Sequence, residues 1–308
     1  MANDIMLSDL VVTKKPEQVF NEIEIIVKMD FDDFDFHNLK TVFFDIVRLF
    51  NGEYPGYQRC TTEYHSLSHT IETFLAIARL INGYLIEGKH ISEKSVLLGH
   101  ISALMHDTGY IQTLDDTSGT GAKYTLSHIS RSIMFMEQYF KEYGFSEEDI
   151  AFCANCIRCT NINTKMKEIG FSSPEEEIIG KMLGIADLIS QISDRNYLEK
   201  LVFLYVEFTE GNVKGFESEL DLFNKTIGFI DFTRKRFFEE LGELNRFMIN
   251  HFKVRWNIDD DLYINSIEKN VNYLKYIVEN KGDDLHNHLR RYDNSNHQNN
   301  TKLLPHNN

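Results

Sequence analysis

Long stretches of helically spaced apolar residues, rarely interrupted by proline, constrain this fold most. The chain has 308 residues and only four prolines, and proline is the residue that most strongly breaks a helix. The segment 71–81 is strongly apolar with helical periodicity, whereas convincing alternating strand patterns are few. We therefore predict an all-α fold, a bundle of helices.

Capping residues indicate where individual helices begin and end. Ser92 is a predicted N-cap of a helix that runs to about residue 104, and Ser173 before Pro174 is the clearest helix start in the chain. Further helices are predicted over 127–143, from 146 onward, and over 195–209, 218–241 and 259–279. The segment 115–121 has the composition of a loop and is a candidate lid over a site.

The length permits one large domain or two small ones. With 42% hydrophobic residues, most of the chain is expected to fold. We predict one α-helical domain over 1–282, with helical extensions at both ends. Residues 283–308 are rich in Asn, His and charge and are predicted to be a disordered tail.

Charge and cysteine usage limit the classes of partner. A net charge of −15 argues against nucleic acid or an anionic membrane as partner, while a small anionic substrate remains compatible because a bound metal is locally positive. The polar start of the chain, the lack of a membrane-length apolar run and the four cysteines predict a cytoplasmic protein. Cys153, Cys156 and Cys159 lie on adjacent turns of one helix without an evident fourth ligand, so we expect them to be structural.

The doublet His106-Asp107 closes an apolar segment. Thr108-Gly109 follows it, and glycine readily takes the left-handed conformation that stops a helix. A helix that ends there lets the imidazole and the carboxylate point into the same cavity.

Other metal-binding side chains stand at a distance from the doublet. His65 and His69 precede it, and Asp187 is a lone acid within an apolar helix. Because an unpaired charge is costly in apolar surroundings, His69, His106, Asp107 and Asp187 together favour a site for a divalent cation. Such a ligand set leaves coordination positions for water, as a catalytic metal requires. The donors accept Zn, Mn, Fe, Co, Ni or Mg, so the metal is left open.

These residues resemble the pattern of the HD-domain metal-dependent phosphohydrolase superfamily, which is a histidine, then His-Asp, then a distal aspartate on helices of an α-bundle. The match falls on His69, His106, Asp107 and Asp187 and spans roughly residues 60–200. The resemblance implies an HD-domain-like helical bundle, one or two divalent metal ions, and hydrolysis of phosphoesters.

The segment Tyr64-His65-Ser66-Leu67-Ser68-His69 is also similar to the Tyr-His-Asn-x-x-His signature of class I cyclic-nucleotide phosphodiesterases. By that similarity His65 is the general acid that protonates the leaving oxygen, His69 is a metal ligand, and Asp107 bridges two metals when a second is bound. Two positions depart from the signature, because Ser66 replaces its Asn and Tyr110 stands where those enzymes carry a further His.

Two residues extend the candidate site. His128 follows the loop at a position where other branches of the superfamily place a second-metal ligand or a phosphate contact. Gln191 lies one turn after Asp187 on the same helix face. It is a candidate to hold a substrate or a metal-bound water, and a helix-surface role is the alternative.

The expected function is metal-dependent hydrolysis of a phosphomonoester or phosphodiester by a metal-activated water, with a small phosphorylated molecule, a nucleotide, as substrate. His65 and Asp107 are the expected catalytic residues. A non-catalytic nucleotide sensor or a helical interaction module is the alternative, as is an HD-fold di-iron oxygenase, which requires more histidine ligands than this chain evidently offers.

Overall fold

The structure is a computed structural model that describes residues 5–280 and 284–289. Within these residues it is all-α, and an isolated bridge between Tyr57 and Thr113 is the sole β pairing. The α-helices are α1 (Leu7–Leu10), α2 (Pro16–Lys28), α3 (His37–Asn51), α4 (Leu67–Ile86), α5 (Glu93–Met105), α6 (His128–Tyr143), α7 (Glu147–Arg158), α8 (Pro174–Ser193), α9 (Tyr197–Glu210), α10 (Glu219–Glu239), α11 (Met248–Trp256), α12 (Leu262–Asn280) and α13 (Leu285–His288). Short 3-10 helices are η1 (Thr108–Tyr110), η2 (Gly121–Tyr124), η3 (Met166–Glu168) and η4 (Leu244–Phe247).

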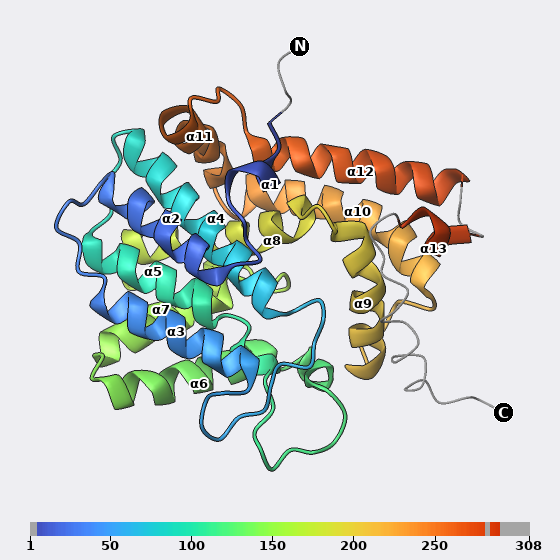
Figure 1. Cartoon of the computed structure of the whole chain (residues 1–308), viewed down its shortest axis with the longest axis horizontal. Helices are drawn as coiled ribbons and strands as arrows, with labels where there is room; N and C mark the ends of the chain where they lie inside the picture. The colour runs from blue at the N-terminus through green and yellow to red at the C-terminus, as the bar shows by residue number, and fades with distance from the viewer. Residues whose placement is uncertain (1–4, 281–283, 290–308) are drawn as a thin grey trace.

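Helices α4 and α8 form the centre of the molecule (Figure 1). They pack against each other, and α4 also contacts α2, α5 and α11 while α8 contacts α5, α7 and α12. Every residue from 73 to 84 and from 182 to 190 is buried. A helix that is apolar on all sides belongs in the interior, which explains why these two segments are the central ones.

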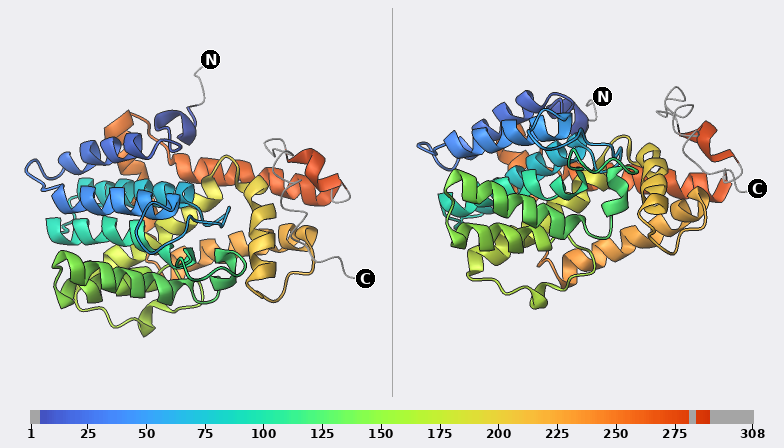
Figure 2. Two further views of the ribbon diagram at one scale, coloured as in Figure 1. Left: turned by 60° about the horizontal axis from the view of Figure 1, so that its bottom comes forward. Right: turned by 90° about the horizontal axis from the view of Figure 1, so that it is seen from below.

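The remaining helices cover this central pair from two sides. Figures 1 and 2 show α2, α3, α5, α6 and α7 on one side and α9, α10 and α12 on the other. Buried apolar side chains from Val19 to Leu289 form one continuous core. The helices expected to supply metal ligands, α4, α5 and α8, therefore meet in the interior.

Most predicted helix boundaries are confirmed. The hydroxyls of Ser92, Ser146, Ser173 and Ser218 each accept a hydrogen bond from a backbone N–H of the following helix, as N-cap residues do. Gly144 ends α6 in the left-handed conformation, with φ of 77°. The predicted loop 115–121 contains no helix up to residue 120, and Gly121, its last residue, begins η2.

Two predictions are wrong. Gly109 does not stop a helix by a left-handed conformation, because α5 already ends at Met105 and Gly109 lies inside η1 with no positive φ. Within the tail predicted to be disordered, residues 285–288 form α13, since Leu285 and Leu289 are buried in the core. The prediction for 290–308 and for residue 283 lies outside the described residues.

The three clustered cysteines are buried, in keeping with the structural role expected of them. Cys153, Cys156 and Cys159 are fully buried on or just after α7. A Cβ added to Gly184 of α8 would lie 2.7 Å from the carbonyl oxygen of Cys159. Small residues on both helices thus allow α7 and α8 to approach closely.

No helix in the described part of the chain combines the length and the apolar character needed to cross a membrane.

Candidate metal centre

Three helices bring the predicted metal ligands together. His69 lies in the first turn of α4, His106 and Asp107 follow the last turn of α5, and Asp187 lies in the middle of α8. All four are buried, with exposed fractions between 1% and 7%. Residues separated by more than a hundred positions therefore meet because α4 contacts both α5 and α8.

The donor atoms of these residues converge. His69 Nε2 lies 3.0 Å from Asp187 Oδ1 and 3.4 Å from Asp107 Oδ2. His106 Nε2 lies 3.2 Å from Asp107 Oδ2 and 3.7 Å from Asp187 Oδ1, and the two Nε2 atoms are 3.3 Å apart. His69, His106 and Asp107 form a group whose ligand atoms all lie within 4.8 Å of one another.

These separations fit a shared cation. Ligands bound at 2.0–2.1 Å lie about 3.3 Å apart in a tetrahedron and about 3.0 Å apart at adjacent octahedral positions. Asp107 Oδ2 is buried without a hydrogen-bond partner among the described residues, although two imidazole nitrogens lie near it. Buried carboxylate oxygens are normally hydrogen-bonded, so this oxygen is suited to a metal ion.

Hydrogen bonds behind the ligands fix their orientation. His106 Nδ1 donates to the carbonyl oxygen of Ala103 at 2.8 Å, which leaves Nε2 facing the carboxylates. Asp187 Oδ1 accepts a hydrogen bond from Gln191 Nε2 at 2.6 Å, and Gln191 Oε1 accepts one from the Tyr64 hydroxyl at 2.9 Å. Partners of this kind hold ligands in place around a metal. The Gln191 amide is thus engaged with a candidate ligand on one side and with Tyr64 on the other.

The electrostatics keep both acids ionised. Burial alone raises the pKa of Asp107 and Asp187, but the neighbouring imidazoles outweigh it and lower both pKa values below the usual range. Burial lowers the pKa of His69, so its Nε2 lone pair is available. At His106 burial is outweighed by the two carboxylates, which raise its pKa; a cation there competes with a proton.

His65 lies beside the ligands rather than among them. Its Nδ1 donates to Glu207 Oε2 at 2.6 Å, and Glu207 Oε1 accepts the backbone N–H of Tyr64 at 2.7 Å. The His65 ring stacks on Tyr110, with ring centroids 4.3 Å apart. Burial lowers the pKa of His65, but Glu207 more than offsets this, so the pKa is raised above 6.5.

His128 approaches the other oxygen of Asp107. Its Nε2 lies 4.0 Å from Asp107 Oδ1, while Nδ1 donates to the carbonyl oxygen of Thr125 at 2.7 Å. Its ring also stacks on Tyr110, with 4.6 Å between centroids, and lies 6.1 Å from the His65 ring centroid. Asp107 therefore has one oxygen near His69 and His106 and the other nearest to His128.

Sequence reasoning missed Glu207. It is a lone acid in the apolar segment Val206-Glu207-Phe208 of α9 and is 4% exposed. The same signal, an acid within an apolar helix, identified Asp187. Tyr110, noted only as a departure from a signature, stacks with the rings of both His65 and His128.

Comparison with known proteins assigns no family to the chain that carries this site. No protein-family model matches the chain, and no curated protein matches it.

Proposed function

We propose that this protein is a metal-dependent phosphohydrolase of the HD-domain type, acting on a phosphomonoester or phosphodiester of a small molecule such as a nucleotide. The observation that carries the proposal is the convergence of His69, His106, Asp107 and Asp187, with Asp107 Oδ2 lacking any hydrogen-bond partner among the described residues. The order of these residues along the chain adds support, because it is the order of the superfamily pattern.

His69, His106, Asp107 and Asp187 would hold the cation, and His128 is placed to join Asp107 at a second one. When bound, such a cation acidifies a water for attack and neutralises charge on a phosphoryl oxygen. Gln191 keeps the Asp187 carboxylate directed at His69. The protein's own contribution is a rigid, buried ligand set.

His65 is the proposed general acid. Glu207 accepts the proton on Nδ1 and stabilises the imidazolium, so the proton to be transferred resides on Nε2. That nitrogen lies 3.5 Å from the Tyr110 hydroxyl. A leaving oxygen near Tyr110 would receive this proton.

Metal analysis of the full chain tests the ligand set. We expect one or two equivalents of transition metal in the parent protein, loss of that metal in Asp107→Ala, and an unchanged helical circular dichroism spectrum. Asp115→Ala is the matched control, because it removes an exposed carboxylate from the loop near the doublet. Equal metal in the parent and Asp107→Ala, with no binding of added Mg or Mn, would refute the proposal.

Turnover separates the hydrolase from its alternatives. We expect hydrolysis of bis(p-nitrophenyl) phosphate or a nucleotide, lost in Asp107→Ala. His65→Asn should retain metal and lower kcat by about 10²–10⁴-fold. Iron with oxygen uptake would favour an oxygenase, whereas tight nucleotide binding without turnover would favour a sensor.

A further inference from the structure

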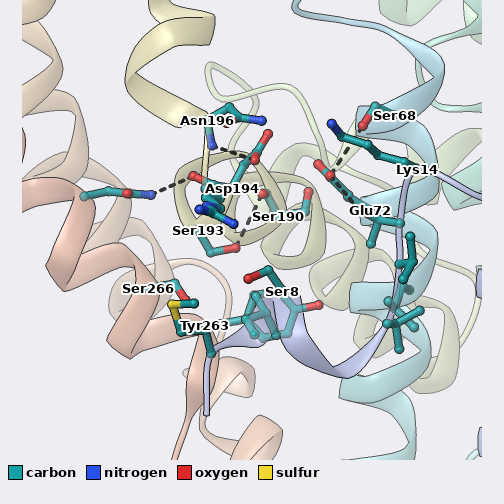
Figure 3. Close-up of a pocket in the computed structure, with 18 of the residues that line it drawn as sticks. Ser8, Lys14, Ser68, Glu72, Ser190, Ser193, Asp194, Asn196, Tyr263 and Ser266 are labelled. Carbon is teal, nitrogen blue, oxygen red and sulfur yellow. Dashed lines mark hydrogen bonds between the residues drawn. The ribbon is translucent and has the colours of Figure 1, made fainter. Parts of the chain in front are cut away.

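A second cavity, distinct from the metal centre, lies between α1, α4, α8 and α12 (Figure 3). Its volume is about 550 Å³, within the range of small-molecule sites. None of the four candidate metal ligands lines it. Ser8, Glu72, Ser193 and Tyr263, labelled in Figure 3, line this cavity, which we call the α1 cavity.

The α1 cavity is positively charged in an acidic protein. The chain carries a net charge of −15, yet five cationic residues and two acidic ones line the cavity: Lys14, Arg79, Arg195, Lys200 and Lys269 against Glu72 and Asp194. Lys200 contacts Asp194 directly and lies 3.7 Å from Glu72 Oε2, so it neutralises part of the acidic charge. Lys14, Arg79 and Lys269 therefore create a local attraction for anions.

Arg79 is the most informative residue of this cavity. It is 2% exposed, and Nη1 donates to the Tyr263 hydroxyl at 3.0 Å. Nε and Nη2 have no hydrogen-bond partner among the described residues, and none of these residues forms an ion pair with Arg79. The rings of Phe252 and Tyr263, each with its centroid 5.6 Å from Arg79 Cζ, stabilise the charge in part. Because they supply no counter-charge, an anion in the cavity would stabilise the folded protein further.

Lys14 and Lys269 add charge at the rim. Both are exposed, and Lys14 comes from the segment after α1 while Lys269 comes from α12. The side chains of Ser8, Asn196 and Ser266, labelled in Figure 3, supply hydroxyl and amide groups between them. A guanidinium with free N–H donors, two lysines and several hydroxyls is the chemistry that binds a phosphoryl group with an attached polar body.

We propose that the α1 cavity binds a phosphorylated small molecule of nucleotide size, with Arg79, Lys14 and Lys269 providing the positive charge for its phosphoryl group. The site is independent of metal at the candidate metal centre. Glu72 of this cavity follows His69 by one turn of α4, and the Ser190 hydroxyl donates to the carbonyl oxygen of Asp187. A ligand here therefore contacts the same two helices that carry metal ligands.

Calorimetric titration of the full chain tests this proposal. The probes are adenosine 5′-monophosphate and inorganic phosphate, with uncharged adenosine as the control, in buffer containing a metal chelator. We expect binding of the monophosphate and, more weakly, of phosphate, but not of adenosine. Binding should persist in Asp107→Ala, which separates this site from the metal centre and from the proposed hydrolysis.

Exposed lysines provide variants that leave the core intact. We expect Lys14→Ala/Lys269→Ala to weaken binding of the monophosphate at least tenfold. The matched control is Lys15→Ala/Lys275→Ala, which removes the same charge from exposed neighbours that do not line the cavity. Equal weakening in both double variants, equal affinity for adenosine, loss of binding in Asp107→Ala, or no binding of either phosphate probe would each overturn the proposal.

Discussion

Gly109→Ala tests whether the His106-Asp107 doublet is held by close backbone contact. A Cβ at this position would lie 2.0 Å from the carbonyl oxygen of His128 and 2.8 Å from the backbone nitrogen of Ser132. Contacts this short with backbone atoms cannot be relieved by a side-chain rotation, so η1 and the first turn of α6 must separate by about 1 Å. That movement would pull apart the bond from Gly109 N–H to Ser132 Oγ and the bond from Ser132 Oγ to the His106 carbonyl, now 2.9 and 2.6 Å.

The expected cost follows from these contacts. Overpacking of this kind costs about 1–3 kcal/mol, and each weakened buried hydrogen bond about 1 kcal/mol. The lower entropy of the unfolded alanine chain returns about 0.4–1 kcal/mol. We therefore expect Gly109→Ala to lower the free energy of unfolding by about 3 kcal/mol.

Urea unfolding followed by circular dichroism measures this loss. Gly228→Ala is the matched control, because Gly228 lies inside α10 and an added Cβ meets nothing within 4 Å. There alanine should stabilise the protein by about 0.5–1 kcal/mol. Equal urea midpoints for Gly109→Ala and the parent protein would refute the close contact between η1 and α6, and with it our account of how the doublet is held.

Three further outcomes are expected. His100 is fully buried, and burial lowers its pKa from 6.5 to about 4. As pH drops from 6.5 to 4 the imidazole is protonated in the unfolded chain before it is protonated in the folded protein, so the free energy of unfolding falls by about 3 kcal/mol. Urea midpoints across this range should fall less steeply in His100→Leu. Arg236→Met should lower the free energy of unfolding by about 3 kcal/mol in urea unfolding, because the buried guanidinium donates hydrogen bonds to four backbone carbonyls, those of residues 159, 161, 162 and 164. An unchanged urea midpoint would contradict this role. Glu207→Gln removes the carboxylate that contributes most to raising the pKa of His65, so the alkaline limb of the kcat–pH profile should move to lower pH. An unmoved limb would exclude His65 as the general acid.

The helical fold was largely predictable from local features. Ser92 and Ser173 cap their helices as expected, and Gly144 ends α6. These signals are local, because a cap hydroxyl bonds a backbone N–H three residues away and needs no distant contact. Helices α2, α3 and α11 were not individually predicted. Helices α2 and α11 pack against α4 and α3 packs against α5, so tertiary contacts contribute to all three.

The sequence by itself determined the all-α class and the group of candidate metal ligands, because helical periodicity and charges within apolar segments follow directly from residue order. The tertiary structure decided the rest. Glu207 pairs with His65, 142 positions away in the sequence. Gly109 allows close packing against α6 instead of ending a helix. Arg79, an arginine in an apolar helix, lines the α1 cavity. Each depends on which helices become neighbours, and that is set by the packing of whole helix faces rather than by local sequence.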